Sequence, residues 1–203
     1  PAAGPSGSGV VLGDATAGAA KATACGACHG IDGNPTDPQY PKLAGQNEAY
    51  IARQLELFKS GKRLNPVMVG FVGTLSTQDM HDIGAYFAAK QVLPGVADKA
   101  MVSTGQALYR GGDAARDIPA CMACHGPDGH GMAGAAYPHL AGQWTDYVMA
   151  KLKDWKNGTV WGNDEHAKIM PTIASRLSDA DIAALSSYVE GLHSAGAADV
   201  AAK

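Results

Sequence analysis

The feature that most constrains this chain is a five-residue segment that occurs twice. The first copy reads Cys-Gly-Ala-Cys-His at residues 25–29, and the second reads Cys-Met-Ala-Cys-His at residues 121–125. Together the two copies contain all four cysteines of the chain, so no thiol remains for a disulfide or a nucleophile. Any fold of this sequence must therefore build two separate sites, each with two closely spaced thiols and an adjacent imidazole.

The C-x-x-C-H spacing indicates covalent attachment of c-type haem, because the two thiols can form thioethers to the two vinyl groups while the histidine reaches the iron. The expected attachment residues are Cys25, Cys28, Cys121 and Cys124, and the expected proximal ligands are His29 and His125. A zinc knuckle or a redox dithiol is the alternative. A structural zinc site usually has its cysteine pairs close together in the sequence, whereas these pairs lie in opposite halves. We therefore expect two haems.

The rest of the sequence repeats in the same order. Residues 40–46 read Tyr-Pro-Lys-Leu-Ala-Gly-Gln, and residues 137–143 differ from them only in having His139 where Lys42 stands. A repeat of this quality predicts a duplicated domain. We expect a leader at 1–13, a first domain at 14–93, a linker at 94–100, a second domain at 101–193 and a tail at 194–203.

Both halves have helical periodicity and no sustained strand alternation. Apolar residues recur at i, i+4 and i+7 from Ile51 and again from Val148, which predicts one amphipathic helix in each half. A Ser-x-x-Asp pattern at 76–79 and at 178–181 predicts the start of a closing helix. The expected fold is all-α, with two tandem cytochrome c-like helical domains related by internal duplication.

Two methionines occupy matching places in the repeat. Met68 and Met170 each lie seven residues before a Leu-Ser pair, in what we expect to be loops ahead of the closing helices. They are the predicted second axial ligands of the two irons. Met80 is a rival in the first half, but its repeat partner is Ile182, so we expect Met80 in the core. His166, four residues before Met170, could displace that methionine.

Net charge and the length of apolar runs exclude two classes of function. The formal net charge of −3 excludes a basic footprint for nucleic acid. No apolar run reaches the ~18 residues of a membrane span. If histidine and methionine fill both axial positions, substrate has no open site on the iron. The predicted activity is therefore single-electron exchange with weakly bound partners, and not catalysis.

With the paired C-x-x-C-H, Y-P-x-L-A-G-Q and methionine motifs, the chain resembles the dihaem cytochromes c4 from about Gly13 to His193. The resemblance implies two class I cytochrome c domains that meet at a pseudo-twofold interface. It also implies that the carbonyls of Pro41 and Pro138 bind the proximal histidines and that Leu43 and Leu140 pack on the haems. Members are periplasmic, are sometimes attached to the membrane surface, and pass electrons toward terminal oxidases.

The sequence thus predicts a periplasmic dihaem electron carrier between a redox donor and an acceptor, the latter a terminal oxidase. The alternative is a dihaem oxidoreductase of the peroxidase or thiosulfate dehydrogenase type, which requires one labile axial ligand. A small-ligand sensor and a fixed subunit of a larger complex are also open.

Overall fold

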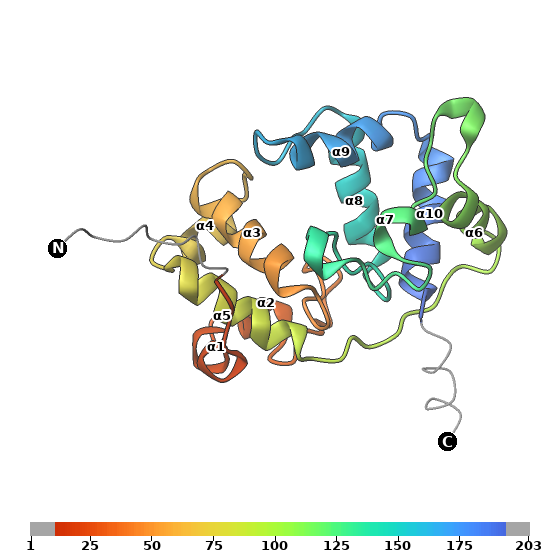
Figure 1. The fold of residues 1–203 in the computed structure, drawn as a ribbon. Helices are drawn as coiled ribbons and strands as arrows, with labels where there is room; N and C mark the ends of the chain where they lie inside the picture. The colour runs from red at the N-terminus through yellow and green to blue at the C-terminus, as the bar shows by residue number, and fades with distance from the viewer. Residues whose placement is uncertain (1–10, 194–203) are drawn as a thin grey trace, which may run out of the picture.

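The computed structural model describes residues 11–193, which form two groups of helices joined by one crossing segment (Figure 1). The first group contains α1 (Ala15–Lys21), α2 (Gly26–His29), α3 (Glu48–Lys59), α4 (Pro66–Val72) and α5 (Thr77–Ala88). The second contains α6 (Val102–Gly111), α7 (Met122–His125), α8 (Thr145–Lys156), α9 (Glu165–Ala174) and α10 (Asp179–Gly191), with short 3₁₀ turns η1 (Ala114–Arg116) and η2 (Ala133–Ala135). Residues 89–101 contain no helix and connect the groups.

The predicted all-α fold with two tandem domains is confirmed. Residues 11–193 form no strand, and their only β-type pairings are two isolated bridges that close the loops around η1 and η2. The predicted leader and tail lie outside the described residues, apart from residues 11–13. Gly13 is already packed, because its N–H donates to Oε1 of Glu48 at 2.8 Å.

Both closing helices begin at the predicted capping boxes. The Ser76 hydroxyl accepts from the N–H of Asp79 at 3.1 Å, and the Asp79 carboxylate accepts from the N–H of Ser76 at 2.8 Å. Ser178 and Asp181 make the same two bonds, at 3.1 and 2.8 Å. These bonds satisfy N–H groups that a helix start leaves without partners.

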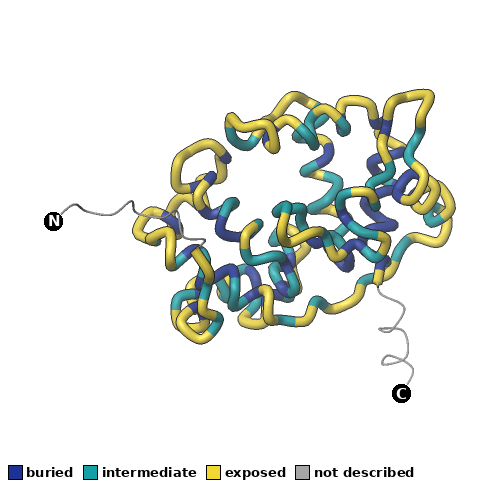
Figure 2. The backbone as a smooth tube through the Cα atoms, in the orientation of Figure 1, coloured by how far each residue is buried: buried dark blue, intermediate teal, exposed yellow. Residues whose placement is uncertain are grey.

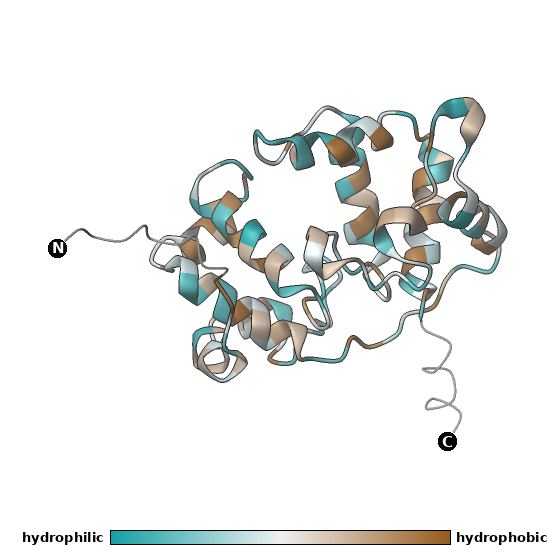
Figure 3. Cartoon of the chain, in the orientation of Figure 1, coloured by the Kyte–Doolittle hydropathy of each residue, from teal (hydrophilic) through white to brown (hydrophobic). Residues whose placement is uncertain are grey.

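Each domain has its own hydrophobic core. Figure 2 shows buried stretches in both domains and in the region between them. In the first domain α3 and α5 pack together, and Phe58 and Phe87 lie in the core between them. Met80 is almost fully buried there, so its predicted core role is confirmed. In the second domain α10 packs on α6 and α8, where apolar residues recur along the helices (Figure 3).

A glycine permits the close crossing of the first and last helix in each domain. A Cβ at Gly18 of α1 would run into the Asp82 carbonyl of α5, and a Cβ at Gly105 of α6 would run into the Ala184 carbonyl of α10. Helix packing at such short range is possible only without a side chain. The glycines lie at equivalent positions, so the duplication preserved this crossing.

We therefore predict opposite effects for two substitutions in α6. Gly105→Ala places a methyl group 2.6 Å from Cβ of Tyr188 and should destabilise the protein by about 1–3 kcal/mol. Gly111→Ala, which meets no atom within 4 Å, should be neutral or stabilising by up to about 1 kcal/mol. Urea unfolding followed by far-UV circular dichroism measures both, and equal stabilities would contradict the close crossing.

The two domains meet through a reciprocal pair of glutamines. The side chain of Gln46 accepts from the N–H of His139 at 2.8 Å and donates to its carbonyl at 2.9 Å. Gln143 does the same with Lys42, at 2.9 Å for both bonds. Each glutamine thus binds the backbone at the variable position of the other domain's Y-P-x-L-A-G-Q segment, which gives the interface an approximate twofold symmetry.

Candidate functional site

The two C-x-x-C-H segments form matching short helices. In each of α2 and α7 the first cysteine precedes the helix and the histidine is its last residue. Gly30 and Gly126 follow with φ of 76° and 79°, a backbone conformation that favours glycine, and turn the chain away. His29 and His125 are buried, while the four cysteines are partly exposed.

Each histidine is oriented by a proline carbonyl. Nδ1 of His29 lies 2.9 Å from the Pro41 oxygen, and Nδ1 of His125 lies 3.0 Å from the Pro138 oxygen. A carbonyl can only accept, so Nδ1–H donates and the Nε2 lone pair is left for a metal. Burial lowers the pKa of both imidazoles, which favours this neutral form.

The proline carbonyls are held in place by the backbone around them. The N–H of Leu43 donates to the Gly33 carbonyl at 2.8 Å, and the N–H of Leu140 donates to the Gly129 carbonyl at 2.7 Å. Two residues further on, Gly45 and Gly142 donate to the last turns of α5 and α10. The segments at 40–46 and 137–143 are therefore fixed in the same way in both domains.

Met68 and Met170 do not lie in loops, and this prediction was wrong. Met68 is in α4 and Met170 is in α9. Asn65 caps α4 by accepting from the N–H groups of Val67 and Met68, at 3.0 and 3.1 Å. Asp164 caps α9. These caps, which the sequence analysis did not use, are the signal that would have predicted both helices.

The structure brings the expected site residues of each domain to one core. Cys25, Leu43 and Met68 all pack against the core of the first domain. Cys121, Leu140 and Met170 pack against that of the second. Each core is therefore bordered by a thiol, a thioether and a leucine from three separate segments, next to a buried imidazole.

These residues fit a haem c group better than zinc. A neutral imidazole and a thioether are the ligand pair of cytochromes c. A structural zinc site needs four thiolate, imidazole or carboxylate ligands, whereas each C-x-x-C-H segment offers only two thiols and one imidazole. Within residues 11–193, no three His, Cys, Asp or Glu side chains gather closely enough to hold a metal ion.

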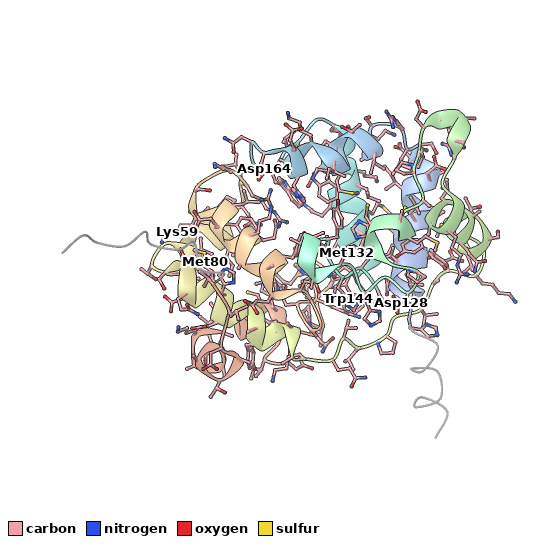
Figure 4. All side chains as sticks on the ribbon, in the orientation of Figure 1. Lys59, Met80, Asp128, Met132, Trp144 and Asp164 are labelled. Carbon is pink, nitrogen blue, oxygen red and sulfur yellow. The ribbon has the colours of Figure 1, made fainter. Side chains whose placement is uncertain are left out.

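Among the other methionines, Met122 and Met149 also pack against the core of the second domain. Three further methionine and histidine side chains lie away from the two cores. Met132, at the start of η2, is half exposed (Figure 4). His166 is exposed on α9, with its ring 6.1 Å from that of Tyr137. His139 is buried at the domain interface, where its N–H binds Gln46.

Sequence reasoning missed a second contact between the domains. The guanidinium of Arg63, from the loop before α4, lies 3.6 Å from the ring centroid of Trp161 and donates to the Tyr147 hydroxyl at 3.0 Å. Arg53 of α3 forms a two-pronged ion pair with Asp164, at 2.8 and 2.9 Å. Arg63 and Trp161 have no counterparts in the repeat, so the register gave no signal for them.

Comparison with known proteins also points to a cytochrome c. The family model for cytochrome c matches residues 15–89 and 102–193. A cytochrome c4 from Pseudomonas aeruginosa is 52% identical over 181 residues, which cover 89% of this chain and 90% of that one. The chain belongs to the cytochrome c4 family. The fold agrees: reduced cytochrome c4 from Pseudomonas stutzeri matches with a TM-score of 0.85 at 43% identity, over 90% of this chain and all of that one.

Membership in this family establishes a dihaem electron-transfer cytochrome with two covalently bound haem c groups, for which the chain has its two C-x-x-C-H cysteine pairs. A different kind of relative, a thiosulfate dehydrogenase electron acceptor from Stutzerimonas stutzeri, is 36% identical over 171 residues, covering 82% of this chain and 78% of that one. None of the helices within residues 11–193 has the length and apolar character to cross a bilayer.

We predict that the two cysteine pairs bind one haem each. Cys25→Ala with Cys28→Ala should leave a protein with a single covalent haem, and so should Cys121→Ala with Cys124→Ala, because each pair supplies both thioethers of its own site. Intact-protein mass spectrometry measures the number of attached groups. Retention of two groups in either variant would contradict the assignment.

A second prediction concerns how the free energy of unfolding changes at low pH. The ion pair with Arg53 lowers the pKa of Asp164 to about 2, from an ordinary value of 3.8. The pair therefore contributes its full stability above about pH 4 and loses it as the pH falls toward 2. The Asp164 side chain is half exposed, so we expect only about 0.5–1 kcal/mol. In urea unfolding, wild type and Asp164→Asn should differ by this amount at pH 6, and the difference should shrink below pH 4 and vanish near pH 2.

Proposed function

We propose that this protein carries single electrons between redox proteins, with His29 and Met68 ligating the iron of the first domain and His125 and Met170 that of the second. The observation that carries the proposal is the repetition, in both domains, of a carbonyl-oriented imidazole and a thioether on the border of one core. When bound, haem c supplies an iron that cycles between its ferrous and ferric states.

The side chains are proposed to hold each site closed and dry. The Nδ1–H bond to the proline carbonyl keeps each imidazole neutral and directed, and it strengthens Nε2 as a donor. A thioether from Met68 or Met170 would raise the reduction potential of a bound haem relative to a second imidazole. Leu43 and Leu140, which pack against the two cores, would exclude water from the bound groups. A histidine and a methionine on each iron would leave no open position for substrate, as a carrier requires.

The interface supports transfer between the two haems. Pro41, whose carbonyl binds His29, is followed directly by Lys42, whose backbone binds Gln143 of the other domain. Pro138 and His139 repeat the arrangement with Gln46. In each domain, the residue that binds the proximal histidine is therefore next in the chain to a residue that contacts the other domain. The covalent connection also keeps the two domains at high effective concentration.

For the pathway, we propose a periplasmic location and a terminal oxidase as acceptor, as the family resemblance implies. The domain boundaries at 14–93 and 101–193 and a peripheral contact with the membrane surface belong to the same proposal. The similarity to two thiosulfate dehydrogenase electron acceptors, at 36% and 37% identity, supports a thiosulfate dehydrogenase as the electron donor. Stopped-flow reduction of the oxidised protein by such an enzyme tests the donor.

We predict that replacing each methionine opens one site. Met68→Ala and Met170→Ala should each remove half of the methionine-to-iron charge-transfer absorbance of the oxidised protein, and each should lower the potential of one haem. Visible spectroscopy and a spectroelectrochemical titration measure the two effects. Met80→Ala, a core change in the first domain, is the control, because it should lower stability by about 2–5 kcal/mol and leave the band intact.

Other results would point to catalysis. If wild type shows the absorbance of only one methionine-ligated iron, one haem is open or has another ligand. Turnover of peroxide or thiosulfate by the purified protein would then support the dihaem oxidoreductase alternative.

A further inference from the structure

The loops that lead into α4 and α9 contact each other across the domain boundary. Residues 60–65 precede α4, and residues 157–164 precede α9. Lys62 of the first loop donates to the side chain of Asn163 in the second, at 3.3 Å. A Cβ at Gly162 would lie 3.4 Å from the Leu57 side chain of the first domain, so the two surfaces are in close contact. We call these two segments the ligand loops.

Arg63 is the central residue of the first ligand loop. It is buried, and its guanidinium lies between the Phe58 ring of its own domain, at 4.5 Å, and the Trp161 ring of the other, at 3.6 Å. It also donates to Gln54 at 2.7 Å and, across the boundary, to Tyr147 at 3.0 Å. A guanidinium stacked on aromatic rings and hydrogen-bonded away from water is held rigidly.

Asp164 is the last residue of the second ligand loop and caps α9, as Asn65 caps α4. Its carboxylate accepts from the N–H of Ala167 at 2.9 Å, which starts α9, and at the same time pairs with Arg53 of the first domain. Asp164 lies at the end of α9 nearest to the first domain (Figure 4). The residue that caps the helix of Met170 is therefore held by the other domain.

The chain connects these contacts directly to the proposed ligands. Arg63 stands two residues before Asn65, whose side chain binds the N–H of Met68. Asp164 stands at the cap of the helix in which Met170 lies. On both sides, a contact with the partner domain fixes the start of the short helix that presents the thioether.

From this geometry we infer that each domain positions the axial methionine of the other. Trp161 and Tyr147 of the second domain contact Arg63 in the loop that leads into the helix of Met68. Arg53 of the first domain pairs with the residue that caps the helix of Met170. These are positioning residues, and they do not touch the iron. The inference rests on the proposed ligation by Met68 and Met170. It adds that the strength of each methionine bond depends on the domain interface.

The test measures how easily imidazole displaces one methionine at a time. In a Met68→Ala background the remaining charge-transfer band reports Met170, and in a Met170→Ala background it reports Met68. Imidazole is titrated into the oxidised holoprotein, and its apparent affinity rises with the fraction of protein whose methionine is detached. Far-UV circular dichroism confirms that each variant is folded.

Each informative variant changes a residue of one domain while the absorbance band reports the methionine of the other domain. Arg53→Gln in the Met68→Ala background should raise the apparent affinity for imidazole about three- to fivefold, the most that a half-exposed ion pair can supply. Trp161→Leu in the Met170→Ala background should raise it about tenfold. Arg53→Lys and Trp161→Phe, which keep a charge or a ring, should restore part of the wild-type value. The matched control is Arg116→Gln, because Arg116 forms a two-carboxylate ion pair inside the second domain.

The outcomes separate the two proposals. If Arg53→Gln and Trp161→Leu leave the imidazole affinity within twofold of their backgrounds, or if Arg116→Gln raises it equally, positioning across the interface is wrong while the ligand assignment stands. If Met68→Ala and Met170→Ala do not each remove half of the band, the ligand assignment itself is wrong, and the inference fails with it.

Discussion

The hydrogen bond from each proximal histidine to a proline carbonyl is the contact on which the rest of this structure depends. It fixes which nitrogen of the imidazole carries the proton and which keeps its lone pair, and it does so from a backbone segment that also builds the domain interface. One segment therefore serves the site and the assembly of the two domains. A change in the path of residues 40–46 or 137–143 would alter the orientation of the imidazole and the domain interface together.

Duplication produced two sites with the same proposed ligands but different surroundings. The helix that carries Met68 has no charged residue, whereas the helix that carries Met170 contains Glu165 and Lys168, which pair at 2.9 Å. The interface cation Arg63 has no counterpart in the second domain. Because nearby charges and solvent access shift a reduction potential, the two sites are not electrostatically equivalent.

Sequence patterns predicted correctly the features that depend on interactions between residues close together in the chain. The capping boxes at Ser76 and Ser178, and the core position of Met80, depend on neighbours a few residues away and on the repeat register. The loops expected around Met68 and Met170 were wrong because the short helices there begin at Asn65 and Asp164, caps that lie at different distances from the two methionines. The alignment of the two repeats was used only at positions where the same residue type occurs in both halves, so it overlooked these two caps.

The sequence by itself determined the chemistry: two C-x-x-C-H segments, matched methionines and a repeat register are enough to specify two haem-binding helical domains. Covalent spacing and short-range hydrogen bonds carry this information along the chain. Only the tertiary structure decided how the domains meet, through Gln46 and Gln143 and through Arg63, Trp161 and Asp164. These partners are about 100 residues apart, so their contacts depend on shape and on the burial of polar groups that no local pattern reports.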